Sequence, residues 1–129
     1  MAANVSGMDW LLIFIQLYGA PVLMLAVSVT YFALDRHNSD LANRLFYSSH
    51  GFAAFILFLV AFIAGVTKHQ RLAFGMPFFA LHAIPVALVL VSLVRYKGPK
   101  AVHLLQVPNL AAMVWSLFIG TMAITGDWL

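Results

Sequence analysis

The chain has 129 residues, of which 64% are hydrophobic and only 9% are charged, and its mean hydropathy is +0.97. A water-soluble domain needs more polar surface than this composition supplies, so a soluble enzyme and a nucleic-acid-binding protein are excluded. The formal net charge of +3 is ordinary for a membrane protein, in which Lys and Arg set the topology. Because the chain has no cysteine, disulfides and thiolate metal sites are excluded as well.

Four apolar stretches are each long enough to cross a bilayer and contain no charged residue. They cover residues 10–34, 45–67, 72–94 and 102–125. Unbroken apolar runs of this length are typical of helices, because barrel strands show a shorter, alternating pattern. The sequence therefore predicts an all-α membrane protein, a four-transmembrane-helix bundle with short loops, and we expect one polytopic membrane domain over residues 1–129. No Lys or Arg precedes the first stretch, so we expect it to be a span and not a secretory signal.

The basic residues are unevenly distributed over the connections between these stretches. One face carries Arg36, Arg44, Arg95, Lys97 and Lys100, and the opposite face carries Lys68 and Arg71. Because basic loops stay in the cytoplasm, we expect the 35–44 and 95–101 loops there, with both termini and the acids Asp9 and Asp127 on the non-cytoplasmic side. The small size and the lack of a targeting sequence favour a bacterial inner (cytoplasmic) membrane.

Each predicted helix has one stripe of small or polar residues on a helical wheel. Such stripes let membrane helices pack closely and bond across the contact, so we expect them to line the bundle. In chain order they are Gln16, Gly19, Ala20, Leu23 and Thr30; His50, Ala54, Leu57, Ala61 and Gly65; Gly75, His82, Pro85, Val89 and Ser92; and Gln106, Asn109, Met113, Ser116 and Gly120. Pro21 and Pro85 are expected to kink their helices, and Pro108 to lie one or two turns inside the last one.

Polar groups inside the membrane are the candidates for function, since their burial is costly unless they are paired. His82 lies ten residues into the third stretch, about 15 Å from the outer face and near the midplane. Its candidate partners are on other helices, which predicts a buried polar network of His82, Gln16, Asn109 and Ser116. A second candidate surface is the aromatic face of the second helix, which would point at lipid or at a partner subunit and consists of Phe52, Phe55, Phe58 and Phe62.

His50 and His103 lie near the cytoplasmic ends of the second and fourth stretches. They are candidate axial ligands of a b-type haem, because two imidazoles on different helices at similar depth suit such a cofactor, and the small residues beside His50 leave room for the ring. The alternative is structural. His50 would then bond Tyr47 or Ser49, and His103 would contact lipid headgroups beside Lys97 and Lys100. The cofactor stays open at this point.

No enzyme motif is present: HExxH, G-x-S-x-G and a Gly-rich phosphate loop are all missing, and glutamate does not occur. The chain is therefore interpreted as a non-catalytic accessory or assembly subunit of a larger respiratory or transport complex, for instance an oxidoreductase, that acts through helix–helix contacts. Two alternatives are an electron-transfer subunit that binds haem and an oligomeric proton or small-solute channel. The expected partners are the lipid bilayer and a membrane protein or further copies of this chain, and not nucleic acid.

Overall fold

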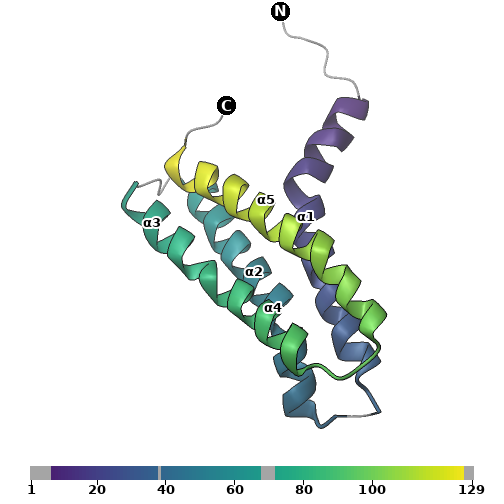
Figure 1. The fold of residues 1–129 in the computed structure, drawn as a ribbon. Helices are drawn as coiled ribbons and strands as arrows, with labels where there is room; N and C mark the ends of the chain where they lie inside the picture. The colour runs from purple at the N-terminus through teal and green to yellow at the C-terminus, as the bar shows by residue number, and fades with distance from the viewer. Residues whose placement is uncertain (1–6, 38, 68–71, 127–129) are drawn as a thin grey trace, which may run out of the picture.

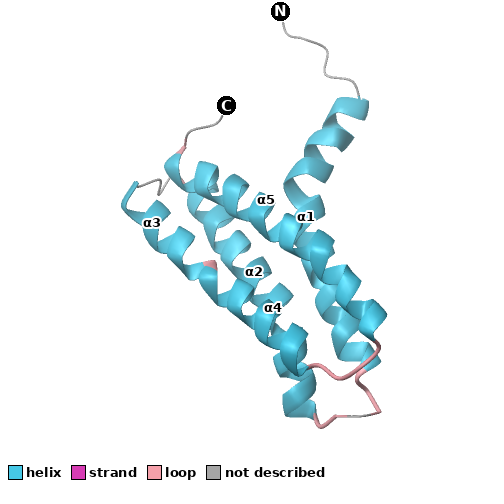
Figure 2. Ribbon diagram, viewed as in Figure 1, coloured by secondary structure: helices cyan, strands magenta, loops and turns pink. Residues whose placement is uncertain are grey.

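The computed structural model describes residues 7–37, 39–67 and 72–126. Within these ranges the chain forms helices and no strand (Figure 2). The predictions made for Lys68, Arg71 and Asp127 lie outside the described residues. The helices are α1 (Gly7–Leu34), α2 (Leu41–Val66), α3 (Leu72–Leu81), α4 (Ala83–Arg95), the short 3₁₀ helix η1 (Lys100–Leu105) and α5 (Gln106–Thr125).

Four helical segments are long and apolar enough to cross a membrane, which confirms the prediction of four long apolar helices. They are Gly7–Leu34, Leu41–Val66, Phe74–Arg95 and Lys100–Thr125. The second begins earlier than the predicted residue 45, because Asp40 caps it and its carboxylate accepts a hydrogen bond from the Asn43 amide.

The third and fourth spans are not the continuous α-helices that the hydropathy predicts. The third is interrupted at His82, whose amide bonds the Phe79 carbonyl three residues back. Pro85 lies just after the break and has no amide hydrogen to continue the ladder. The fourth opens as 3₁₀ helix, so that Pro108 falls in the first turn of α5, where a missing amide hydrogen leaves no bond unmade.

α2 is the central helix of the bundle and packs against α1, α3, α4 and α5 (Figure 1). α5 packs against α1 and α3 as well. α1 begins and α5 ends at the same end of the bundle, and the first turns of α1 diverge from the other helices. The opposite end holds the loop between α1 and α2 and the connection between α4 and η1.

Two glycines of α2 lie against the backbone of a neighbouring helix. A Cβ on Gly51 would collide with the Ser28 hydroxyl and with the Met24 carbonyl of α1. A Cβ on Gly65 would lie 2.8 Å from the Ala123 carbonyl of α5. Small residues at these positions therefore let three helices approach at backbone distance, as in other membrane bundles.

The predicted stripes of the second, third and fourth spans coincide with the buried faces of these helices: the fourth-span residues Gln106, Asn109, Met113, Ser116 and Gly120 are all buried. The stripe predicted for the first span is wrong. α1 instead buries a face that includes Met24, Val27 and Tyr31, which are too large to stand out as a small-residue stripe. Thr30 can lie off this face because its hydroxyl donates to the Ala26 carbonyl of its own helix.

The two halves of the bundle differ in the chemistry of their interiors. Near the end where α1 begins, the core is apolar and centres on Ala61, Phe78 and Ile124. Near the other end, aromatic and polar side chains from α1, α2, η1 and α5 are packed together. The candidate site lies in this second half.

Candidate functional site

A buried polar triad joins α2 to α5. Gln106 Nε2 donates to His50 Nε2 at 3.2 Å, and Asn109 Nδ2 donates to Gln106 Oε1 at 2.8 Å. Because the amide nitrogen can only donate, His50 Nε2 is the acceptor and the ring proton resides on Nδ1. Nδ1 of His50 and Oδ1 of Asn109 are buried without a hydrogen-bond partner. The triad therefore has spare hydrogen-bonding capacity at both of its ends.

Tyr31 of α1 connects this triad to the end of the bundle. Its ring meets the His50 ring edge-on, with centroids 5.4 Å apart, and its hydroxyl lies 3.1 Å from His103 Nδ1, a hydrogen bond in either tautomer. Tyr96 packs against Tyr31 and His103, at centroid distances of 5.0 and 5.5 Å. These two tyrosines are completely or almost completely buried, and neither belongs to an aromatic belt at the membrane interface.

The arrangement does not fit a haem held by His50 and His103. His50 is completely enclosed by protein and its Nε2 already accepts the Gln106 amide. The Tyr31 ring contacts both imidazoles and bonds one of them, so the space that a porphyrin would need is filled by an aromatic side chain. His50 bonds neither the Tyr47 nor the Ser49 side chain: it is the Tyr47 backbone that interacts with its ring, and Ser49 donates to the Phe46 carbonyl.

The network predicted around His82 is not formed. His82 is buried, but its Nδ1 lies 3.0 Å from the Phe78 carbonyl of its own span, and its Nε2 has no hydrogen-bond partner. Ser116 is buried with an unpartnered hydroxyl, and Asn109 bonds Gln106. Gln16 has an exposed side chain on the outside of α1, because the helix buries a different face; only its carbonyl is engaged, by Trp115 Nε1.

The four phenylalanines of α2 do not form one outer face. Phe52 is exposed and Phe55 is half-buried, whereas Phe58 is buried and stacks on the half-buried Phe62. Phe62 in turn meets Tyr18 of α1 edge-on. This correction follows from the position of α2 at the centre of the bundle, where most of its faces meet a neighbouring helix.

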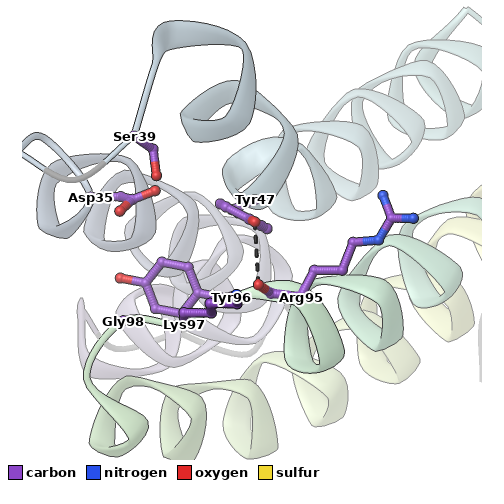
Figure 3. Close-up of a pocket in the computed structure, with 7 residues that line it drawn as sticks. All are labelled: Asp35, Ser39, Tyr47, Arg95, Tyr96, Lys97 and Gly98. Atoms are coloured by element: carbon purple, nitrogen blue, oxygen red, sulfur yellow. Dashed lines mark hydrogen bonds between the residues drawn. The ribbon is translucent and has the colours of Figure 1, made fainter.

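A pocket of about 420 Å³ lies beyond the polar cluster, at the end of the bundle (Figure 3). Asp35, Tyr47 and Tyr96 border it, and Figure 3 shows the Asp35 carboxylate and the hydroxyl of Tyr96 turned toward the same space while the Arg95 guanidinium points away. Asp35 and Tyr96 are each only 5% exposed, and both Asp35 Oδ2 and the Tyr96 hydroxyl lack a hydrogen-bond partner. Burial raises the pKa of Tyr96 above its ordinary value, and the negative charge of Asp35 adds to this effect.

A second pocket, of about 590 Å³, adjoins the first and has the opposite charge. Lys97, Lys100 and His103 line it, and it shares Tyr96, Lys97 and Gly98 with the first pocket. The expectation that His103 lies beside the two lysines is thus met by this pocket, although the His103 side chain is half-buried and tied to Tyr31.

Sequence reasoning singled out His50, His103, Asn109 and Ser116, and it placed Gln106 on a packing stripe. It did not assign Tyr31, Asp35 or Tyr96 to a site. A signal was present for Asp35, because this carboxylate directly follows an apolar span and so must lie at the end of the bundle. No pattern in the sequence distinguishes a buried tyrosine at a helix end from one in an interfacial belt.

The paired polar side chains are in this half of the bundle, whereas the core around Ala61 and Phe78 is apolar except for the His82 ring that packs on Phe78. Among the described residues no cluster of three metal-ligating side chains occurs. Comparisons with protein-family models, curated proteins and solved structures found no match to this chain.

Proposed function

We propose that this protein is a small membrane subunit that associates with another membrane protein through the first half of α1. The observation that carries the proposal is the exposed side chain of Gln16. It lies about 9 Å along α1 from residue 10, where the apolar stretch begins, and therefore inside the apolar part of the span. An amide at this depth is costly in hydrocarbon, and a second transmembrane helix with a polar group at the same depth would satisfy it.

The surroundings of Gln16 support the same interpretation. The side chains of residues 11–15 are all exposed, so that no face of this segment is covered by the rest of the chain. The first turns of α1 leave the bundle, as Figure 1 shows. The side chains of residues 11–15 are therefore free to contact a partner helix, up to the point where Trp115 of α5 bonds the Gln16 carbonyl.

The test is the mass of the complex in mild detergent, measured on native gels for the wild type, Gln16→Leu and Thr30→Val. We expect the wild type and Thr30→Val to migrate well above the 14.2 kDa of one chain, and Gln16→Leu to be released as the single subunit. Thr30→Val is the matched control because its hydroxyl is already bonded within α1. A complex that survives Gln16→Leu would contradict the proposal. If two differently tagged copies of this chain were recovered together, the partner would be a second copy of the chain and not another membrane protein.

We further propose that the Asp35 end of the bundle faces the cytoplasm of a bacterial inner membrane. The excess of Lys and Arg at this end supports the orientation. The chain contains no cysteine, so single-cysteine variants can be labelled without background. In intact spheroplasts, an impermeant maleimide should label Met8→Cys and leave Arg36→Cys unlabelled until the cells are lysed; the reverse pattern would invert the orientation.

A further inference from the structure

The Asp35 carboxylate is the only acidic group among the residues that border the two adjoining pockets. A carboxylate that is 95% enclosed and has an oxygen without a partner is costly, unless a cation or a donor completes it. Within the described residues no ion pair of Asp35 is formed, although several basic residues lie in the same loops. The pocket in front of it is therefore suited to a positively charged group.

The ring faces and hydroxyls around Asp35 narrow the chemistry of that group. Tyr47 and Tyr96 form an edge-to-face pair with centroids 5.3 Å apart, and the Tyr47 hydroxyl donates to the Arg95 carbonyl, which holds its ring in place. Aromatic rings beside a carboxylate favour an ammonium group, through its hydrogen bonds to the oxygen and its attraction to the ring faces. The free Tyr96 hydroxyl offers one further hydrogen bond.

The neighbouring pocket is lined by basic residues and therefore suits a negatively charged group. Lys97, Lys100 and His103 line it, and a lone cation that approached Asp35 would be repelled by the two lysines. A molecule that carries an ammonium and a phosphate would satisfy both pockets at once, since Lys is a common phosphate-binding residue. Both pockets lie at the end of the spans, where phospholipid headgroups are found.

We propose that the paired pockets bind a phosphorylated primary amine, an ethanolamine-phosphate zwitterion, with the ammonium at Asp35 and Tyr96 and the phosphate at Lys97 and Lys100. Two sources share this chemistry. One is the headgroup of phosphatidylethanolamine and the other is soluble O-phosphoethanolamine.

The test is lipid binding to the full chain in detergent, followed by native mass spectrometry with phosphatidylethanolamine, phosphatidylcholine and phosphatidylglycerol. We expect phosphatidylethanolamine to bind most tightly, because choline has no N–H to donate and glycerol has no positive charge. If phosphatidylglycerol bound as tightly, the basic rim alone would explain binding and the proposal would be overturned.

Two isosteric substitutions distinguish binding in the pocket from a general effect of the negative charge in the loop. Asp35→Asn should weaken phosphatidylethanolamine binding on the order of tenfold, the loss expected for a charged hydrogen bond. Asp40→Asn removes the same charge from the same loop, but Asp40 is an exposed helix cap and Asn caps as well, so binding should not change. Equal effects of the two variants, or none from Asp35→Asn, would overturn the proposal.

Two further variants keep the test decisive if Asp35→Asn fails to fold. Tyr96→Phe keeps the ring and removes a hydroxyl that has no partner in the protein, so the bundle should stay intact while binding weakens several-fold. Lys97→Gln should weaken binding as well. Tighter binding in Lys97→Gln would overturn the proposal, because it would identify the Lys97 ammonium as the cation that Asp35 already holds.

Competition with O-phosphoethanolamine distinguishes the two sources. Displacement of the lipid at comparable concentrations would support the proposed chemistry with a soluble zwitterion as the ligand. Retention of the lipid in a large excess of O-phosphoethanolamine would support it with a membrane lipid, whose acyl chains remain among the helices.

Discussion

His50 and Gln106 supply each other's hydrogen bond in a part of the bundle that is closed to solvent. Removing one side chain leaves the other unpaired, so the two substitutions should not be additive. We expect a double-mutant cycle of His50→Ala and Gln106→Ala to give a coupling of about 0.6 kcal/mol, and at most about 1.7 kcal/mol, as for other interhelical bonds in membranes. The measurement is the free energy of unfolding in detergent. The control pair, His82→Ala with Gln106→Ala, should be additive, and coupling there or its absence at His50 would contradict the assigned triad.

Gly51 is the residue on which the contact between α1 and α2 depends. Its neighbours are the Ser28 hydroxyl and the Met24 backbone, and a backbone carbonyl cannot turn aside as a side chain can. Gly51→Ala should therefore force the helices apart and lower the free energy of unfolding by about 1–3 kcal/mol, the usual cost of overpacking.

The matched control for this change is Gly19→Ala in α1. Its added methyl would meet only the Ile15 side chain, at an ordinary 3.6 Å, so we expect no loss of stability. Thermal unfolding followed by circular dichroism checks both variants. Equal melting temperatures for Gly51→Ala and the wild type would show that the close approach at Gly51 is not required.

At the scale of the helix, Asp40 is the capping residue that sets where α2 begins. Its carboxylate accepts the Asn43 amide at the start of α2. Asp40→Ala should cost about 0.5–2 kcal/mol of stability, whereas Asp40→Asn should cost little, because Asn caps equally well. Chemical denaturation of both variants is the measurement. A similar loss in the two would point to the charge of Asp40, and not to its capping bond, as the cause.

The sequence predicts the elements to different degrees, for identifiable reasons. Hydropathy locates all four spans, because a span must be apolar over its full length. It does not predict the interruption at His82, since a histidine and a nearby proline are also compatible with a kinked but continuous helix. The buried face of α1 is missed because in lipid both faces are apolar, so that Met24 and Tyr31 look no different from lipid-facing residues. His50, Gln106 and Asn109 are each predictable as members of a packing stripe, but the bond between His50 and Gln106 depends on how α2 and α5 are rotated against each other.

At the scale of the whole molecule, the polar half of the bundle ends at an apolar half. Protons or polar solutes that enter beside Tyr96 would meet the apolar cluster of Ala61, Phe78 and Ile124, where the neighbouring His82 has an unpartnered Nε2 and so forms no continuous hydrogen-bonded path. We therefore expect liposomes that contain the purified chain, with a trapped pH-sensitive dye, to equilibrate a pH gradient no faster than protein-free liposomes. A faster rate that returns to the protein-free value in His50→Phe would contradict this and would favour a channel.

The packing order also has a consequence for biosynthesis. His50 and Tyr31 lie in the first two spans, whereas Gln106 and His103 lie in the last, so the early hairpin enters the bilayer with its imidazole unmatched. During that interval the imidazole lacks the Gln106 amide, which is costly in hydrocarbon. Docking of the final span supplies this bond, so we expect the first two spans to reach their full stability only after the fourth has been inserted.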